Sequence, residues 1–179
     1  GYCEHYLVLR EIIDGQKVQG GIVPLPGDFV SGVHRGAFSK TDGHLYVVGT
    51  DGWQSYAPEN GSLERIRWTG GGMLLPESVE TRKNGLIIRF NEFIDSKSLD
   101  INKAFAEQWN YLYSGAYGSP EYSVRNPGIT GHDPVEIDSL NLLEDGKSIF
   151  LEISQLHPVM QFHLYLELKT RDGRSFKPD

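Results

Sequence analysis

The sequence predicts an all-β fold, and three observations support this prediction. Apolar and polar residues alternate with a period of two in several stretches, most clearly over residues 160–168. Asn-Gly and Asp-Gly dipeptides separate the alternating stretches, as expected at tight turns. No stretch combines a 3.6-residue apolar period with helix caps at both ends. Short strands joined by turns are therefore expected along the whole chain.

Two strand regions are predicted in the first part of the chain. Residues 6–13 are mostly apolar and end at Asp14-Gly15, which indicates a strand followed by a turn. Residues 33–38 and 44–48 flank a turn at residues 41–43, and this pattern predicts a hairpin. Glycine-rich loops separate these strands from one another.

Two further hairpins are predicted in the second part. Residues 79–90 form the first, and its strands are joined by Asn84-Gly85, a dipeptide that tolerates the positive φ angles of a type I′ turn. Residues 135–143 and 148–153 form the second, across the polar turn at residues 144–147.

A long aromatic strand is predicted over residues 105–113, although residues 98–108 are also compatible with one or two helical turns. Alternate positions of the strand carry Phe105, Trp109, Tyr111 and Tyr113. An aromatic row of this kind belongs more often to the core of a β-sandwich than to a binding platform. We therefore expect these side chains to point inward.

The last strand, over residues 160–168, completes a predicted β-sandwich. Alternation gives each strand one face that can be buried, so two antiparallel sheets are expected over residues 79–170. The side chains expected inside are Ile88, Phe90, Phe162, Leu164 and Leu166. A glycine-rich break at residues 69–72 predicts a domain boundary near residue 72, with a first part at 1–72 and a β-sandwich module at 73–179.

Composition excludes several classes of protein. The chain has 179 residues, with 17 Lys and Arg against 24 Asp and Glu, so its net charge is −7. This acidic balance disfavours binding to nucleic-acid phosphates. No apolar run reaches the roughly 18 to 20 residues of a membrane span. The single cysteine, Cys3, excludes an internal disulfide and a cysteine-rich zinc site.

Several runs of residues resemble a known family. Residues 33–49 (VHRGAFSKTDGHLYVVG) resemble a blade hairpin of the quinoprotein sugar dehydrogenases, the soluble glucose and L-sorbosone dehydrogenase-like six-bladed propellers. Later runs are similar to the sandwich-like module that follows such propellers, namely residues 109–111 (WNY), 117–124 (YGSPEYSV), 131–133 (GHD), 150–153 (FLEI) and 156–161 (LHPVMQ). The resemblance implies terminal β-propeller blade strands over residues 1–72, followed by an antiparallel immunoglobulin-like β-sandwich.

This resemblance also implies a function for a longer parent protein. The parent would be a periplasmic or extracellular dehydrogenase that oxidises a sugar or polyol through pyrroloquinoline quinone and passes electrons to a cytochrome c. The family's proton-accepting histidine lies on an early blade, so this chain alone is not expected to be catalytic. The implied partners are the remainder of the parent chain, a cytochrome c domain and a sugar ligand. The alternative function is a non-catalytic module that binds carbohydrate or docks a redox partner.

The resemblance implies a role for Arg35 in cofactor binding. Arg35 lies seven residues before Asp42 and matches the second arginine of a family pattern that holds the carboxylates of the quinone. Val33 stands at the position of the first arginine, and Gly36 at that of the acid.

Residue chemistry gives a candidate ligand-binding set of Arg35, His34 and Trp53. A strand-end arginine suits a carboxylate or a sugar acid, and the competing interpretation is an ion pair with a nearby acid. His34 is expected to point to the other face of the same strand, where a structural role is favoured over a functional one. Trp53 follows Gly52 in a loop, where an indole face would stack on a sugar ring or fill a domain junction.

The remaining polar residues give no catalytic or metal-binding prediction. The histidines do not show metal-ligand spacing. His132 and Asp133 are adjacent in a glycine-containing run, and adjacent residues do not face each other as a catalytic dyad requires. We therefore expect this pair to lie in a surface loop.

Overall fold

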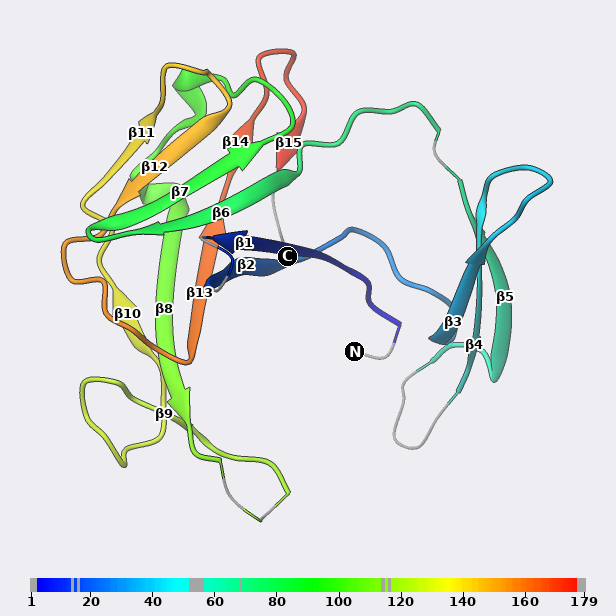
Figure 1. Cartoon of the computed structure of the whole chain (residues 1–179), viewed down its shortest axis with the longest axis horizontal. Coiled ribbons are helices and arrows are strands. Elements are labelled where there is room, and N and C mark those ends of the chain that lie inside the picture. Colours follow the sequence, from blue (N-terminus) through cyan, green and yellow to red (C-terminus); the bar gives the residue numbers. More distant parts are fainter. Residues whose placement is uncertain are drawn as a thin grey trace. The chain divides into compact units, whose positions relative to one another are not determined.

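The all-β class is confirmed by the computed structural model (Figure 1). The structure describes residues 3–13, 15, 17–51, 57–67, 69–113, 115 and 117–176. Within these ranges every regular element is a β-strand or a single turn of 3-10 helix. No helix in this part of the chain is long and apolar enough to cross a membrane.

The chain divides into two compact units. Unit 1 comprises Gly1–Val8 and Ile22–Met73, whereas unit 2 comprises Leu9–Gly21 and Leu74–Pro178. Residues before the predicted boundary near residue 72 thus contribute to both units, and the boundary itself stays a prediction. Strands β1 (Tyr6–Ile13) and β2 (Lys17–Pro24) form a two-stranded sheet, which confirms the first predicted strand.

Unit 1 contains one antiparallel sheet of three strands in the order β3-β4-β5. The strands are β3 (Gly32–Phe38), β4 (Leu45–Thr50) and β5 (Gly61–Ile66). Pairing of Phe38 with Leu45 across the turn confirms the predicted hairpin. The pairing register shifts between Val33 and Arg35, which is the mark of a β-bulge.

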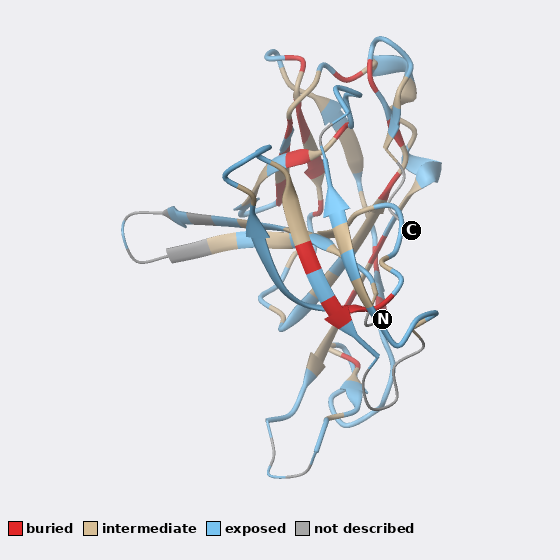
Figure 2. Cartoon of the chain, turned by 90° about the vertical axis from the view of Figure 1, so that its right-hand side faces the viewer, coloured by how far each residue is buried: buried red, intermediate tan, exposed pale blue. Residues whose placement is uncertain are grey.

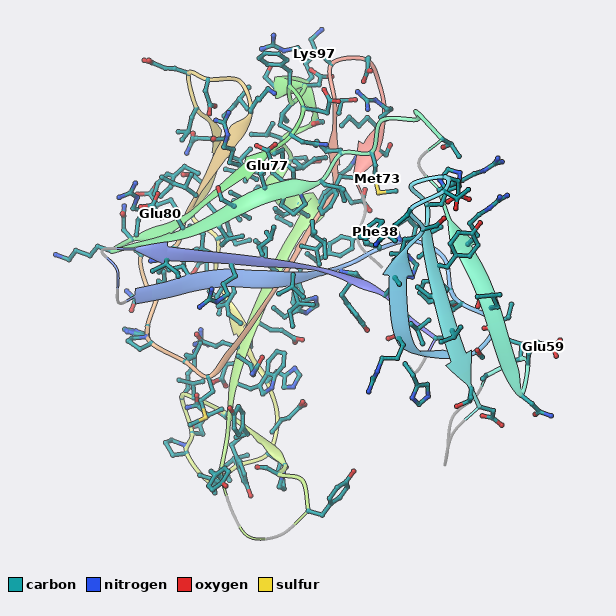
Figure 3. All side chains as sticks on the ribbon, turned by 45° about the vertical axis from the view of Figure 1, so that its right-hand side comes forward. Phe38, Glu59, Met73, Glu77, Glu80 and Lys97 are labelled. Atoms are coloured by element: carbon teal, nitrogen blue, oxygen red, sulfur yellow. The ribbon has the colours of Figure 1, made fainter. Side chains whose placement is uncertain are left out.

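Apolar side chains are exposed on both faces of this sheet. Phe38, labelled in Figure 3, is 74% exposed and pairs with Leu45 on one face. Leu63 is 70% exposed and pairs with Val48, which points to the opposite face because successive strand residues alternate. Figure 2 shows that buried positions in these strands fall mainly on β4, the central strand. The sheet therefore leaves apolar surface uncovered on both sides.

Unit 2 contains two antiparallel sheets of four strands each. The first has the order β11-β12-β7-β6, with β6 (Pro76–Arg82), β7 (Gly85–Phe90), β11 (Ser139–Leu142) and β12 (Ser148–Glu152). The second has the order β10-β8-β13, with β8 (Ala104–Tyr111), β9 (Glu121–Tyr122) pairing with β8, β10 (Asp133–Val135) and β13 (Gln161–Leu166). Strands of the two sheets cross one another in Figure 1.

Short elements connect the two sheets. The helical turns that residues 98–108 also allowed are limited to η1 (Ser96–Ser98) and η2 (Ile101–Lys103), each one 3-10 turn. Asp95 and Asp100 cap them by accepting hydrogen bonds from the backbone N–H groups two residues on. A small hairpin of β14 (Leu168–Lys169) and β15 (Ser175–Phe176) ends the described chain.

One hydrophobic core lies between the sheets of unit 2, which confirms the β-sandwich character (Figure 2). Its buried members are Leu74, Leu86, Ile88, Phe90, Ile94, Ala106, Val135, Ile149, Leu151, Ile153, Leu166 and Leu168. Three residues expected inside, Ile88, Phe90 and Leu166, are buried, and Phe162 and Leu164 are partly buried against the core. Period-two alternation therefore identified the inward face of β7 and β13.

The predicted Asn84-Gly85 turn is placed one residue too late. Arg82 pairs directly with Gly85, so the two residues between the strands are Lys83 and Asn84. Gly85 already belongs to β7, where a Cβ atom would lie 2.0 Å from the carbonyl oxygen of Leu151. The glycine is required because the neighbouring strand passes this close to its backbone, and the turn forms just before it.

The predicted strand over residues 135–143 is divided between the two sheets. Asp133–Val135 pair with β8 in one sheet, and Ser139–Leu142 pair with β12 in the other. The crossing segment, residues 136–138, is held by the backbone N–H of Asp138, which donates to the carbonyl of Glu152 at 2.8 Å. Strands that change sheets in this way form the corners of packed sheets.

Candidate ligand-binding site

The predicted residues Arg35 and His34 lie on β3 and are exposed. The Nη1 atom of Arg35 donates to the carbonyl of His34 at 2.7 Å, and His34 Nε2 lies 3.2 Å from the Thr50 hydroxyl. The bulge at Val33–Arg35 interrupts the alternation from which opposite faces were expected for these two residues. Trp53 lies outside the described residues, so a site shared by Arg35 and Trp53 stays a prediction.

The surroundings of Arg35 do not by themselves fit a quinone cofactor. Pyrroloquinoline quinone carries several carboxylates, and Arg35, between His34 and Gly36, is the only arginine or lysine on β3. One of its guanidinium N–H groups is already engaged by a backbone carbonyl.

The aromatic row lies on the outer face of β8 and just beyond its end, contrary to its predicted place in the core, and Trp109 is the one member that is half-buried. Phe105 is 46% exposed, Tyr111 is 41% exposed and Tyr113 is fully exposed. The inward positions of β8 are instead taken by Ala106 and Gln108, which are buried. A small residue such as Ala106 lets the facing sheet approach β8 closely, so the bulky aromatic residues occupy the outer face.

A histidine with two carboxylate partners lies beside this row. His132 Nδ1 is 3.0 Å from Oε1 of Glu107 on β8, and His132 Nε2 is 2.6 Å from Oε2 of Glu121 on β9. The imidazole also stacks on the indole of Trp109, with ring centroids 3.9 Å apart and an interplanar angle of 6°. Residues from two strands of one sheet, β8 and β9, thus meet around His132, which directly precedes β10.

His163 extends the cluster along the neighbouring strand β13. Its Nδ1 atom lies 3.3 Å from Oε1 of Glu107, and its ring meets Phe105 edge-on at 6.4 Å between centroids. The register of β13 places His163 directly opposite Glu107. We call the outward surface formed by Phe105, Glu107, Trp109, Tyr111, His132 and His163 the β8 face.

The electrostatics of the β8 face favour a charged His132. Hydrogen bonds to Glu121 and then to Glu107 raise the pKa of His132 above its ordinary value. Burial raises the pKa of Glu107, but its bonds with His132 and His163 outweigh burial, so the pKa lies below its ordinary value. Both directions describe the same ion pair between imidazolium and carboxylate.

Asp133 points away from His132 and has a structural role. Its carboxylate accepts hydrogen bonds from the Ser123 hydroxyl at 2.7 Å and from the backbone N–H groups of Val124 and Arg125 at 2.6 and 2.8 Å. Burial raises the pKa of Asp133, but these hydrogen bonds lower the pKa by more than burial raises it. The pKa therefore lies below its ordinary value. The two residues do not form a dyad, yet Asp133 is buried in β10 rather than lying in a surface loop.

Metal binding finds no support in the described part of the chain, where no group of three or more His, Cys, Asp or Glu side chains is placed to hold an ion. Of the β8 face, the sequence prediction named the aromatic residues but placed them inward, and it did not assign His132 or His163 to a site. The sequence contained one sign that the aromatic row faces outward. Glu107 lies on the same side of the strand as the aromatic residues, and a carboxylate seldom points into a core.

Comparison with protein-family models, curated proteins and solved structures finds no match to this chain.

Proposed function

We propose that unit 2 is a non-catalytic carbohydrate-binding β-sandwich whose ligand lies along the β8 face. The observation that carries this proposal is the exposed aromatic row on β8, at Phe105 and Tyr111, on the outer side of a sheet whose inner side forms the core. Exposed aromatic rings in a row suit the apolar C–H faces of sugar rings. Large exposed apolar patches on a well-packed domain mark binding surfaces.

Polar groups on the same face suit sugar hydroxyls. Glu107 and Glu121 supply carboxylate oxygens, and His163 supplies ring nitrogens, all beside the aromatic rings. A few polar groups among aromatic side chains are the usual composition of a small-molecule site. The acidic chain and the absence of a cation within the β8 face other than its histidines favour a neutral sugar over a polyanion.

The test is retention by a panel of neutral polysaccharides, including a soluble β-glucan and a xylan, in affinity gel electrophoresis. Replacing both Phe105 and Tyr111 with alanine is expected to weaken retention by a bound polysaccharide about tenfold, because each stacked ring contributes about 0.5–1.5 kcal/mol. Phe38→Ala, which removes an exposed aromatic ring from unit 1, is the matched control and should leave retention unchanged. Equal retention of the double variant and the parent chain would contradict the proposal.

A second candidate follows from the sheet of unit 1. We propose that β3-β4-β5 is part of the terminal blade of an extracytoplasmic, periplasmic or extracellular, propeller protein of the sugar or polyol dehydrogenase type, which passes electrons to a cytochrome c. Propeller blades are four-stranded antiparallel sheets repeated around an axis. Such blades have neighbours on both sides, and this sheet exposes Phe38 on one face and Leu63 on the other. The remainder of the parent chain would cover both faces.

Amide hydrogen exchange tests this second candidate. In the chain alone, the amides of β3 and β5 are expected to exchange much faster than in the full parent protein, because this three-stranded sheet leaves apolar side chains exposed on both faces. The amides of β7 and β12, inside the sandwich, serve as an internal control and should be protected in both samples. Equally slow exchange of β3 and β5 in both samples would show that the sheet needs no neighbours.

A further inference from the structure

We propose that charged His132 is a pH-dependent clamp that holds residues 121–132 against β8 and so keeps the β8 face in its ligand-binding form. The clamp is defined by the contacts of His132 with Glu107, Glu121 and Trp109. Its effect on ligand binding rests on the proposed carbohydrate function, whereas its effect on residues 121–132 does not.

The two carboxylates define the protonation state that the clamp requires. A neutral imidazole has one N–H donor, and its other nitrogen is an acceptor. Ionised carboxylates are acceptors only, so the contacts of 3.0 Å to Glu107 and 2.6 Å to Glu121 can both be hydrogen bonds only when His132 is doubly protonated. Deprotonation leaves one lone pair facing a carboxylate oxygen, which is repulsive.

The clamp closes a loop at its base. Glu121 and His132 stand at the two ends of residues 121–132, where the N–H of Gly131 donates to the carbonyl of Glu121 at 3.0 Å. Tyr122 forms bridges both to Asn110 of β8 and to Thr130. Two kinds of contact therefore hold the ends of this loop against β8. One is the short backbone pairing of β9, and the other is the set of side-chain bonds made by His132.

Trp109 couples the clamp to the aromatic row. The imidazole lies parallel to the indole at 3.9 Å, a geometry that a cationic ring strengthens through the negative face of the indole. Loss of the charge on His132 weakens this stack as well as one carboxylate bond. Trp109 lies between Phe105 and Tyr111 in the row, so its placement affects the centre of the β8 face.

The groups facing His132 from each neighbouring element are few. β8 presents Glu107 and Trp109, β9 presents Glu121, and β13 presents His163, which shares Oε1 of Glu107. The adjacent Asp133 is occupied by Ser123 and by backbone N–H groups on the inner side.

The sign of the pH effect follows from the directions of the shifts. The pKa of His132 is raised, so the clamp stabilises the fold below the ordinary histidine pKa and is lost as the pH rises through the raised value. The pKa of Glu107 is lowered, so at the acid end the clamp is lost only as the pH falls through that lowered value. Ligand affinity should therefore be highest in the mildly acidic range between these two limits.

The experiment measures the pKa of His132 and the amide protection of residues 123–131 in the absence of any ligand. A proton–carbon NMR titration gives the pKa of His132, and amide exchange gives protection factors for residues 123–131, corrected for the intrinsic pH dependence of exchange. We expect protection to fall at least about tenfold across the measured His132 titration, as for the loss of one charge-assisted hydrogen bond. Glu121→Gln removes a carboxylate partner of His132, so it should move the midpoint of the His132 titration and the midpoint of the loss of protection to lower pH. Glu144→Gln, on the turn between β11 and β12, should move neither midpoint.

Polysaccharide retention over the same pH series separates the two proposals. Loss of retention at the His132 midpoint, shifted together with it by Glu121→Gln, supports the clamp as regulator of the site. A His132 pKa at its ordinary value, or protection that does not follow its titration, overturns the clamp. Titration and protection as expected, with no polysaccharide retained at any pH, support the clamp and overturn the carbohydrate function. Retention that is independent of pH overturns the regulation alone.

Discussion

Replacing Phe90 with alanine is expected to lower the free energy of unfolding of unit 2 by about 3 to 5 kcal/mol, the usual cost of truncating a buried phenylalanine. Phe90 ends β7 and is 1% exposed. Its ring meets Phe176 of β15 edge-on, with centroids 5.6 Å apart. The truncation therefore leaves a cavity where the last hairpin packs on the sandwich, and the surrounding strands can collapse into it only in part.

Urea unfolding followed by circular dichroism checks this prediction, with Leu164→Ala as the comparison. Leu164 packs against the same core but is only partly buried, so its truncation should cost about 2 kcal/mol, at the lower end for a leucine. Phe90→Ala should therefore have clearly the lower midpoint. Equal midpoints for the two variants would mean that Phe90 is not a central member of the core.

Gly85→Ala is expected to destabilise unit 2 by about 3 kcal/mol or more, because overpacking and backbone strain act together at this position. A Cβ atom at residue 85 would lie 2.0 Å from the carbonyl oxygen of Leu151 and 2.9 Å from Cε2 of Phe150. Gly85 pairs with both β6 and β12, so the new methyl group cannot be accommodated without separating strands on either side. The thermal unfolding midpoint is the measurement.

The matched control for this substitution is Gly131→Ala. Gly131 has a φ of 137°, near the 158° of Gly85, but a Cβ atom there would meet nothing within 4 Å. The control thus carries a similar backbone cost without the close approach. If both variants lost the same stability, the cost at Gly85 would come from its dihedral angle and not from Leu151.

Local patterns were sufficient to predict most strands but not the partners of each strand. The alternation of residues 160–168 identified β13 and its inward leucines, because period two is a property of the strand alone. The exact turn before Gly85 depends on Leu151, which is distant in sequence. The division of residues 133–142 between two sheets could not be predicted either, because the strand-like pattern continues through Ile137 without a break.

The candidate site was harder to predict for the same reason. Parity shows that Phe105, Trp109 and Tyr111 share one side of β8, but it does not show which side faces the core. That choice depends on Ala106, which is small enough to lie beneath the facing sheet. His132 directly precedes β10, and His163 lies on β13. Both reach Glu107 only because β10 and β13 lie on opposite sides of β8.

The crossing of residues 136–138 from one sheet to the other links the two halves of the sandwich covalently at an edge. Residues 133–135 cannot leave β8 without pulling on residues 139–142, which are paired with β12. A partly unfolded state that keeps one sheet and releases the other would expose the shared core, in which Ile88 and Ile149 of one sheet are buried with Ala106 and Leu166 of the other. Unit 2 is therefore built to unfold as one cooperative body, with its two sheets melting together rather than in sequence.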